Sequence, residues 1–379
     1  MSKLPLKIGK SLQKRKDDGS FRTLKISTGL VDFSSNDYLG FAGNLQIFER
    51  VGTILKENRI GKNGAGGSRL LTGNHILYPQ AEDRIAAYHK AEAALIFNSG
   101  YDANLGFFSA VPGKGDVILY DEFIHASIRD GIQLSRAKAF KFRHNDLEDL
   151  EKKVSRLKND ISGEVYLVTE SVFSMDGDSP NLELLAAYAD VNNFHLIIDE
   201  AHAVGIHGAG IIAEKELQEK TFARIVTFGK ALGTHGAAIL GSEDLKDYLI
   251  NFSRSLIYST ALPPHALATV IAAYQELEGH GQKEVQKLQE RIRFFRRRIS
   301  KMEFPQHFLE SQSAIQVFLF PGNDNVKRAS KKLTEKGFDV KPILSPTVPK
   351  GEERLRICLH SFNGEEEISE LLSALKLLK

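Results

Sequence analysis

Short apolar runs, separated by helical patterns, are the feature that most constrains how this chain folds. Several runs are continuously apolar, which is typical of strands covered on both faces, as in a mostly parallel sheet. Their alternation with helices predicts an α/β fold with a doubly wound sheet. The predicted strands span Ala94–Asn98, Val117–Tyr120, Ala137–Phe142, Val165–Thr169, His195–Asp199, Arg224–Phe228 and Ala237–Leu240.

One of the predicted intervening helices illustrates the second half of this pattern. Over Asn145–Lys158, Leu147, Leu150 and Val154 recur on one stripe of a helix. Asn145 is expected to cap the first turn, because asparagine side chains accept hydrogen bonds from free N–H groups there. The segment therefore predicts an amphipathic helix that covers one face of the sheet.

The pattern changes near Pro263-Pro264, and this change divides the chain. Beyond it we expect an amphipathic helix through Val285 and Ile299, a β-like run over Ala314–Phe320, and further helices and a strand. The predicted parts are an N-terminal arm over 1–35, a large domain over 36–262 and a smaller α+β domain over 263–379. The arginines of the amphipathic helix fit either a solvated face or attraction of phosphate groups of a ligand.

Composition excludes several classes of function. The 50 Lys and Arg residues nearly balance 48 Asp and Glu residues, so no basic surface for nucleic acid or an anionic membrane is expected. No stretch approaches about 18 uncharged apolar residues, the length of a membrane-spanning helix. Cys358 is the only cysteine, which excludes an internal disulfide and a cysteine-rich zinc site. We expect a cytoplasmic enzyme that needs no metal ion.

Three polar segments follow predicted strands, where ligands bind in open α/β sheets. Asp199-Glu200-Ala201-His202 ends one strand, but an acidic pair alone also fits a Mg²⁺ site. Lys230 lies in a glycine-flanked turn, where partial desolvation favours amine chemistry, although alone it also fits an exposed loop lysine. Asn98-Ser99-Gly100-Tyr101 opens a predicted helix whose first N–H groups suit an anion, although such a segment is often only a turn.

Together these segments resemble the α-oxoamine synthases, a family of fold-type I pyridoxal-phosphate (PLP) enzymes that join an amino acid to an acyl-CoA with loss of CO₂. The resemblance runs from about residue 30 to the C-terminus. It is carried by Asp32–Gly40, Gly64–Ser68, Glu170–Asp178, Asp199–His202 and Tyr258–Thr260. It implies an aspartate aminotransferase-like PLP transferase fold, with a mostly parallel central sheet and a smaller C-terminal domain.

The resemblance also implies a PLP site, with Lys230, His125, Asp199 and His202 as catalytic residues. Lys230 would bind the cofactor and act as general base. Asp199 would keep the ring nitrogen protonated, so that the ring accepts electrons, and His125 would stack on the ring. Further cofactor contacts are implied for His202 and Ser174 near the phenolic oxygen, for Gly100, Tyr101 and Thr227 at the phosphate, and for Ser259 and Thr260 at the phosphate of a partner subunit. A homodimer with a shared active site is therefore expected.

Substrate contacts follow from the same resemblance. Arg356 would clamp the amino-acid carboxylate, because guanidinium binds carboxylate through two hydrogen bonds. Arg354 is expected to point the same way, so the choice of Arg356 rests on the resemblance. Thr347 and Asn36 would contact the substrates. The family's acyl-contacting arginine of the N-terminal arm has three possible counterparts here, which are Lys14, Arg15 and Arg22.

Within the family, the contexts Asn36–Gly40 and Ser345–Pro349 favour the branch that condenses L-alanine with a pimeloyl thioester, on CoA or a carrier protein, in biotin biosynthesis. Sister branches that use glycine or serine stay open, because one methylene discriminates by only about 1–3 kcal/mol. They are the glycine C-acetyltransferase, 5-aminolevulinate synthase and serine palmitoyltransferase types. A non-catalytic subunit of the same fold is another alternative. The presence of Lys230, Asp199 and His125 together argues against it. A nucleotide-binding oxidoreductase is disfavoured because its G-x-G-x-x-G turn is missing.

Overall fold

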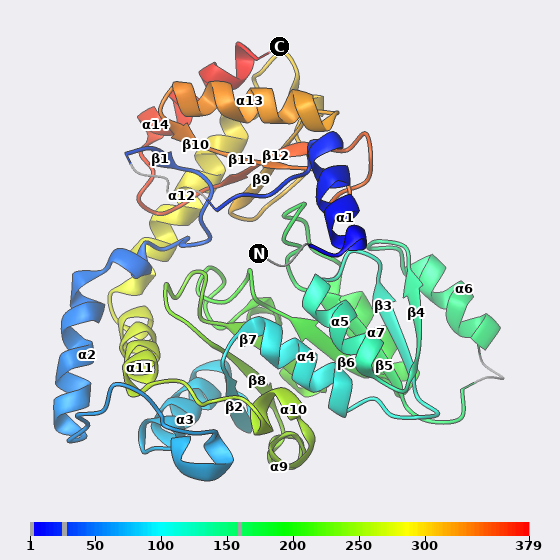
Figure 1. Cartoon of the computed structure of the whole chain (residues 1–379), viewed down its shortest axis with the longest axis vertical. Helices are drawn as coiled ribbons and strands as arrows, with labels where there is room; N and C mark the ends of the chain where they lie inside the picture. The colour runs from blue at the N-terminus through cyan, green and yellow to red at the C-terminus, as the bar shows by residue number, and fades with distance from the viewer. Residues whose placement is uncertain (1–3, 25–28, 158–160, 379) are drawn as a thin grey trace. The chain divides into compact units, whose positions relative to one another are not determined.

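The structure, a computed structural model, describes residues 4–24, 29–157 and 161–378. The chain forms two compact units (Figure 1). The larger holds Asn36–Ser174 and Asp178–Gln286, and the smaller holds Met1–Ser35, Met175–Gly177 and Lys287–Lys379. Within the described ranges, no helix combines the length and the apolar composition that crossing a membrane requires.

Among the described residues of the larger unit, a seven-stranded sheet runs in the order β2-β8-β7-β6-β5-β3-β4. The strands from β3 to β7 pair in parallel, whereas β8 is antiparallel to β7 and β2. This confirms the predicted mostly parallel α/β sheet, and each predicted strand end lies within one residue of the observed end. The strands are β2 (Ala93–Phe97), β3 (Val117–Asp121), β4 (Lys138–Phe142), β5 (Val165–Glu170), β6 (His195–Asp199), β7 (Ala223–Thr227) and β8 (Ala237–Gly241).

Two apolar cores explain why these strands are apolar at nearly every position. Ile118 of β3 and Ile197 of β6 pack in one core, together with Phe107 of α4. Their chain neighbours Leu119 and Ile198 pack in the other core, on the opposite face. Because successive side chains of a strand point to opposite faces, both faces gain hydrophobic burial.

Helices cover both faces of this sheet. The helices α4 and α5 contact each other and lie side by side (Figure 1). The helices of the larger unit are α2 (Leu45–Glu57), α3 (Leu77–His89), α4 (Gly100–Ala110), α5 (Ala126–Leu134), α6 (Leu147–Leu157), α7 (Leu182–Val191), α8 (Ile211–Glu214), α9 (Glu243–Phe252), α10 (Arg254–Ile257) and α11 (Pro264–Glu278). Short helical turns are η1 (Phe41–Gly43), η2 (Arg69–Gly73) and η3 (Gln218–Lys220).

Two local predictions differ from this structure. Asn145 does not cap α6: its φ is +53°, and Asp146 instead accepts the N–H of Asp149 at 2.8 Å. The predicted helix end at Lys158 lies outside the described residues. Helix α11 belongs to the larger unit although the predicted boundary lay at residue 262, because α11 packs on α2 and α3.

The smaller unit contains a three-stranded antiparallel sheet in the order β11-β12-β9 and a parallel pair of β1 and β10, within its described residues. Its strands are β1 (Val31–Asp32), β9 (Ile315–Leu319), β10 (Phe338–Asp339), β11 (Lys341–Ile343) and β12 (Arg354–Cys358). Its helices are α1 (Leu6–Asp17), α13 (Asn323–Glu335), α14 (Glu365–Lys376) and the turn η4 (Pro305–His307), while α12 (Gly281–Ile299) continues into it from the larger unit.

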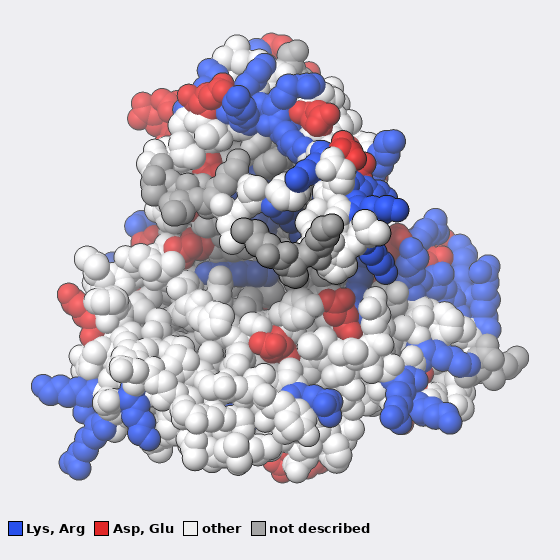
Figure 2. Space-filling model, in the orientation of Figure 1, with Lys and Arg blue, Asp and Glu red and all other residues white. Residues whose placement is uncertain are grey.

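The structure adds detail to two predictions, the N-terminal arm and the basic face of α12. The arm contains helix α1, which buries none of its residues. The sequence therefore had no core-facing apolar stripe from which this helix could be predicted. On α12, Arg291 pairs with Glu365 of α14 at 3.3 Å. Acidic and basic side chains intermingle on the face of the smaller unit that Figure 2 shows.

The turn after β7, which carries Lys230, is built tightly against the start of the larger unit. Within the turn, the N–H of Gly233 donates to the carbonyl of Lys230 at 2.8 Å, and the N–H of Thr234 donates to the carbonyl of Phe228 at 2.8 Å. Gly233 has a φ of +61°, and a Cβ there would lie 2.1 Å from the backbone nitrogen of Ala42. Only glycine fits this position.

We predict that Gly233→Ala lowers the free energy of unfolding by at least about 2 kcal/mol, because left-handed backbone strain adds to overpacking. Chemical denaturation measures this change. Gly229→Ala, in the same turn, is the control, because the nearest atom to its added Cβ is at 3.5 Å and its φ is not positive. Equal effects of the two substitutions would contradict the prediction.

Candidate active site

Asp199 lies at the carboxyl end of β6, and its side chain is fully engaged. The residue is 5% exposed. One carboxylate oxygen accepts the N–H of Ala201 at 2.9 Å, and the other accepts the side-chain amide of Asn104 at 2.9 Å. A buried carboxylate needs such donors, because it has lost its hydration. Asp199 is therefore held in one orientation.

A hydrogen-bond chain connects Asp199 to His125, through the buried residues Asn104 and Ser127 to a histidine that is exposed. The amide of Asn104 also donates to Ser127 Oγ at 3.1 Å, and Ser127 Oγ lies 2.8 Å from His125 Nδ1. His125 caps α5, accepting the N–H of Ser127. Burial lowers the pKa of His125, and the Lys230 ammonium lowers it further, while Asp199 opposes both. The structure thus brings together His125, Asp199 and Lys230. The hydrogen bonds between Asp199 and His125 run through Asn104 and Ser127, which the sequence did not single out.

Glu170 is a further carboxyl group at this edge. It ends β5, pairs in register with Asp199 of β6 and is 3% exposed. Burial and then the charge of Asp199 raise the pKa of Glu170 well above its usual value, although Lys230 and the N–H of His125 act in the opposite direction. Its Oε1 has no hydrogen-bond partner among the described residues. Burial beside Asp199 therefore favours the protonated form of Glu170.

His202 follows Asp199 in the chain and is held by the segment that carries Asn36. Its Nδ1 lies 2.8 Å from the hydroxyl of Tyr38, which donates to Asn36 Oδ1 at 3.1 Å. His202 and Tyr38 are both buried. Asn36 and His202, two residues singled out from the sequence, are thus linked through one tyrosine that was not.

The N-terminus of α4 forms a potential anion site beside β7. Ser99 caps the helix, accepting the N–H of Asp102 at 3.0 Å, and so leaves the N–H groups of Gly100 and Tyr101 at the helix start. A Cβ added to Gly100 would lie 3.6 Å from Thr227 Oγ1. Gly100, Tyr101 and Thr227 therefore meet at one place, and both donor types suit a phosphate.

The remaining predicted residues of the larger unit lie on connecting segments. Ser174 is half-buried in the loop after β5. Ser259 is half-buried and Thr260 is exposed, and the carbonyl of Thr260 accepts the side-chain amide of Asn98 at 2.8 Å. This bond holds the 259–260 segment beside the strand that leads into α4.

In the smaller unit, Arg354 and Arg356 differ in their partners. Arg354 is 3% exposed and pairs with Asp176 and, at 3.2 Å, with Glu352. Arg356, two residues along β12, places its Nη1 2.9 Å from Cys358 Sγ. Thr347 is exposed in the loop between β11 and β12. Arg354 is thus committed to carboxylates of its own unit.

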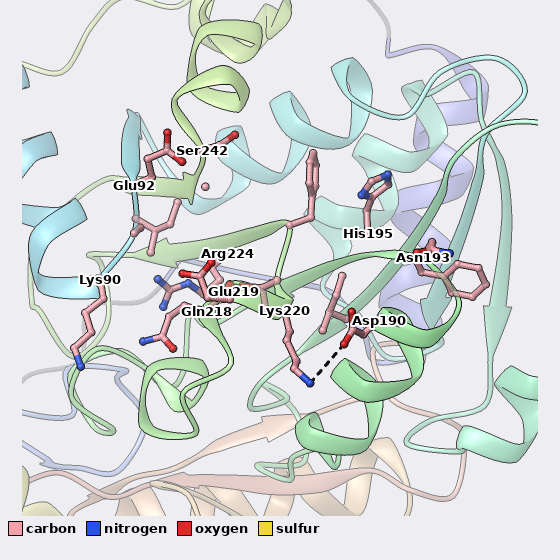
Figure 3. Close-up of a pocket in the computed structure, with 18 residues that line it drawn as sticks. Lys90, Glu92, Asp190, Asn193, His195, Gln218, Glu219, Lys220, Arg224 and Ser242 are labelled. Carbon is pink, nitrogen blue, oxygen red and sulfur yellow. Dashed lines mark hydrogen bonds and ion pairs between the residues drawn. The ribbon is translucent and has the colours of Figure 1, made fainter.

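The opposite edge of the large sheet holds a cavity of about 510 Å³ (Figure 3). Its lining includes His195 at the start of β6 and Phe222 before β7, so it lies where the parallel strands begin. Acidic and basic side chains line it together, and Lys220 pairs with Asp190 at 3.6 Å. The residues predicted for catalysis are at the other edge, and none of them lines this cavity.

Comparison with known proteins identifies the family of this chain. Residues 28–375 match the aminotransferase class I and II family. A protein from Emericella nidulans named 8-amino-7-oxononanoate synthase is 39% identical, with 97% of this chain and 94% of that protein covered. One of the same name from Marinobacter nauticus is 36% identical over 97% of this chain and 95% of that protein.

Solved structures point to the same group of proteins. A serine palmitoyltransferase from S. paucimobilis with a bound PLP–myriocin aldimine has a TM-score of 0.88 at 25% identity, covering 98% of this chain and 96% of that one. The 8-amino-7-oxononanoate synthase from Francisella tularensis has a TM-score of 0.76 at 29% identity, covering 93% and 98%. The chain therefore belongs to the aminotransferase class I and II family, and within it to the α-oxoamine synthases of PLP fold-type I.

Proposed function

We propose that this chain catalyses the decarboxylative condensation of L-alanine with a pimeloyl thioester to 8-amino-7-oxononanoate, a biotin precursor, with pyridoxal 5′-phosphate held on Lys230. The observation that carries the proposal is the meeting of Lys230, Asp199 and His125 at the carboxyl edge of the sheet. The identity of 36–39% to the synthases of that name supports this branch.

The chemistry of the donor groups fits pyridoxal phosphate. Gly100 and Tyr101 at the start of α4, with Thr227, supply N–H and hydroxyl donors for a phosphate. Asp199 supplies a carboxylate for a ring nitrogen, and the imidazole of His125 supplies a flat ring for stacking. Ser174 and His202 would hold the phenolic oxygen. The amine of Lys230, half-buried in its turn, would bind the aldehyde.

When bound, the cofactor supplies a protonated ring that accepts the electron pair released at the α-carbon of the amino acid. Lys230 takes the α-proton as general base, and its amine is suited to this because nearby protein partly excludes water. Asp199 keeps the ring nitrogen protonated, since an opposite charge favours the protonated form. Asn104 and Ala201 hold that carboxylate in place.

Because burial favours the protonated form of Glu170, we assign the negative charge of this strand pair to Asp199. Two adjacent carboxylates at 3% and 5% exposure cannot both ionise at low cost. A neutral Glu170 would not compete with Asp199 for the ring nitrogen.

The clamp for the alanine carboxylate is Arg356 in this proposal, as Arg354 is paired with Asp176 and Glu352. Thr347 and Asn36 would contact the acyl substrate. Lys341, a possible partner for the far carboxylate of pimelate, pairs with Asp339 at 2.6 Å. In the smaller unit, a cavity of about 1120 Å³ is lined by Lys14 and Arg15 but not by Arg22, which favours the first two as contacts of the thioester carrier.

A cytoplasmic homodimer with a shared active site completes the proposal. Large apolar side chains that are exposed in the single chain support it, because such surface is usually covered by a partner. Four of these side chains lie close in sequence to Gly64–Ser68 or to Ser259 and Thr260. They are Leu70, Leu71, Ile76 and Tyr258. Ser259 and Thr260 would then reach the phosphate of the partner subunit.

A serine palmitoyltransferase type of activity is the second candidate. The serine palmitoyltransferase structure matches this chain with a TM-score of 0.88, above the 0.76 of the Francisella tularensis synthase. Its sequence identity to this chain is lower, 25% against 29%. Fold similarity favours serine and a long acyl chain, whereas sequence similarity favours alanine and pimelate. Side chains in the site decide specificity more directly than fold does, so alanine is the stronger candidate.

The purified chain is expected to release CoA from pimeloyl-CoA with L-alanine, and to yield a product with the mass of 8-amino-7-oxononanoate. Glycine or serine, and palmitoyl-CoA or acetyl-CoA, form the comparison panel, read as kcat/KM. A preference for serine with palmitoyl-CoA would establish the second candidate, and no CoA release with any pair would indicate a non-catalytic subunit.

Lys230→Ala is expected to lower kcat by at least about 10³-fold, because the α-proton loses its general base. Lys246→Ala, on α9, is the control and should turn over at the wild-type rate. Circular dichroism checks that both variants fold. Substantial turnover by the folded Lys230→Ala variant would show that another group performs this step.

Glu170→Gln is expected to keep turnover close to wild type, because glutamine resembles the protonated carboxyl. If the pKa of Glu170 is higher in the folded than in the unfolded state, the wild type loses stability as the pH rises above the unfolded-state pKa. The free energy of unfolding of Glu170→Gln relative to wild type should therefore increase from pH 5 to pH 8. Urea denaturation at both pH values measures this, with Glu57→Gln at an exposed position of α2 as control. An unchanged difference would mean that Glu170 is ionised.

A further inference from the structure

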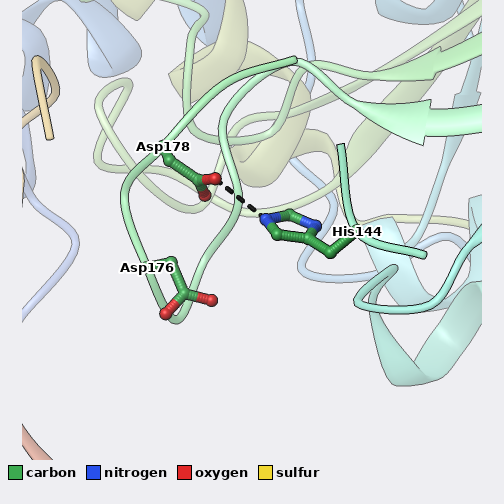
Figure 4. Close-up of side chains that lie close together, drawn as sticks. All are labelled: His144, Asp176 and Asp178. Atoms are coloured by element: carbon green, nitrogen blue, oxygen red, sulfur yellow. Dashed lines mark hydrogen bonds and ion pairs between the residues drawn. The ribbon is translucent and has the colours of Figure 1, made fainter. Parts of the chain in front are cut away.

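His144 lies just beyond β4 and is held by carboxylates at both ring nitrogens. Its Nδ1 is 2.9 Å from Asp121 Oδ1. Its Nε2 is 2.8 Å from Asp178 Oδ2, the contact that Figure 4 shows. A neutral imidazole has one N–H donor, whereas an imidazolium has two. Burial lowers the pKa of His144, but hydrogen bonds and charge from Asp121 and Asp178 outweigh it and raise the pKa to about 10. The ring is an imidazolium at neutral pH.

The two carboxylates belong to different loops. Asp121 ends β3, and it also accepts the N–H groups of Phe123 and Asn145, each at 2.8 Å. It therefore shapes the turn that leads to α5. Asp178 lies in the connection from β5 to α7, and its backbone carbonyl accepts the N–H of Phe173 at 2.9 Å. One cation thus joins two chain segments that are far apart in the sequence.

Aromatic side chains from the same two loops enclose the ring. Phe123 stacks on His144 with ring centroids 4.5 Å apart, and Phe173 meets its edge at 4.5 Å. The side chain of His144 is 18% exposed. Reduced access of water strengthens the ion pairs beyond those of a surface histidine.

We propose that His144 is a positioning residue that ties the 121–125 turn to the 171–178 loop and so keeps His125 and Ser174 in place. This consequence for the cofactor site rests on the proposed function. His125 is two residues after Phe123, and Ser174 is next to Phe173, so each aromatic contact of His144 lies beside one of them. The ring makes no contact with substrate in this proposal and acts only through the loops.

Two other carboxylates near His144 do not replace its two partners. Asp176 has an oxygen within 4.8 Å of the ring (Figure 4), but it pairs with Arg354. Glu122 accepts the backbone N–H of His144 at 3.3 Å, and its other oxygen pairs with Lys141 at 3.4 Å. Glu122 therefore faces the backbone of His144 and an exposed lysine. Asn145 donates to Asp178 at 2.7 Å, which supports the same junction from the neighbouring position.

The test compares His144→Gln with a matched control, His195→Gln. His195 also bonds a carboxylate, that of Glu164 at 2.9 Å, at the edge where β6 begins, but among the described residues it does so through one nitrogen only. Hydrogen–deuterium exchange of the full chain without cofactor should accelerate about tenfold or more in peptides covering 121–127 and 171–178 of His144→Gln. It should stay unchanged there in His195→Gln. Dialysis against pyridoxal phosphate should then give a Kd at least about tenfold higher for His144→Gln alone, equal to a loss of about 1.4 kcal/mol.

The charge of His144 can be read in the wild-type chain, even where a variant fails to fold. Histidine NMR signals in a titration without cofactor should show His144 as an imidazolium throughout pH 6–9. Stabilisation by a raised pKa is complete below the unfolded value near 6.5 and is lost as pH rises through about 10. The stability difference between wild type and His144→Gln should shrink over that range.

A His144 midpoint between pH 6 and 7, or unchanged exchange in both peptides, would overturn the proposal. Exchange that accelerates together with an unchanged Kd would overturn the link to the cofactor site. If the wild-type chain bound no pyridoxal phosphate, the proposed function would fail, while the titration and the exchange would still decide the role of His144 in joining the loops.

Discussion

Parallel pairing of β5, β6 and β7 is the constraint on which the active site depends. Glu170 pairs with Asp199, and Asp199 pairs with Ile225, so three strands end at one edge of the sheet. The glycine turn that follows β7 then places Lys230 at the same edge. The apolar cores on the two faces hold this register through close packing, because a shift of one residue would exchange side chains of different shape between the two cores.

Burying ionisable groups at this edge is costly, and the structure reduces the cost in three ways. Asp199 receives hydrogen bonds from Asn104 and from the N–H of Ala201. At Glu170 beside it, burial raises the pKa and so favours the uncharged form. Farther along the edge, His144 stays protonated between two carboxylates. Each group is thus held in the charge state that its neighbours stabilise, which is how a protein fixes acid and base roles in advance.

Much of the fold followed from the sequence, because strands buried on both faces leave a strong apolar signal. Helix α1 was missed for the opposite reason, since it buries no side chain. The cap of α6 was assigned to Asn145 instead of its neighbour Asp146, because both residue types cap helices and only geometry separates them.

The candidate site was predictable only where chemistry-bearing residues follow strands. Lys230 and Asp199 met that criterion, and the resemblance to a known family supplied His125. Asn104 and Tyr38 did not, since their partners lie 95 and 164 residues away in the chain and nothing local marks them. Glu170 stood within a quoted motif, but its importance comes from its register with Asp199, which only strand pairing reveals. The same holds for His144, whose two carboxylates come from different loops.

The central claim is that Lys230 carries the cofactor, and covalent trapping tests it most directly. The chain is incubated with pyridoxal phosphate, reduced with borohydride, digested and analysed by peptide mass spectrometry. The account predicts a phosphopyridoxyl group on the peptide that contains Lys230, at close to one per chain. A chain that condenses L-alanine with pimeloyl-CoA but carries the adduct on another lysine, or on none, would contradict it.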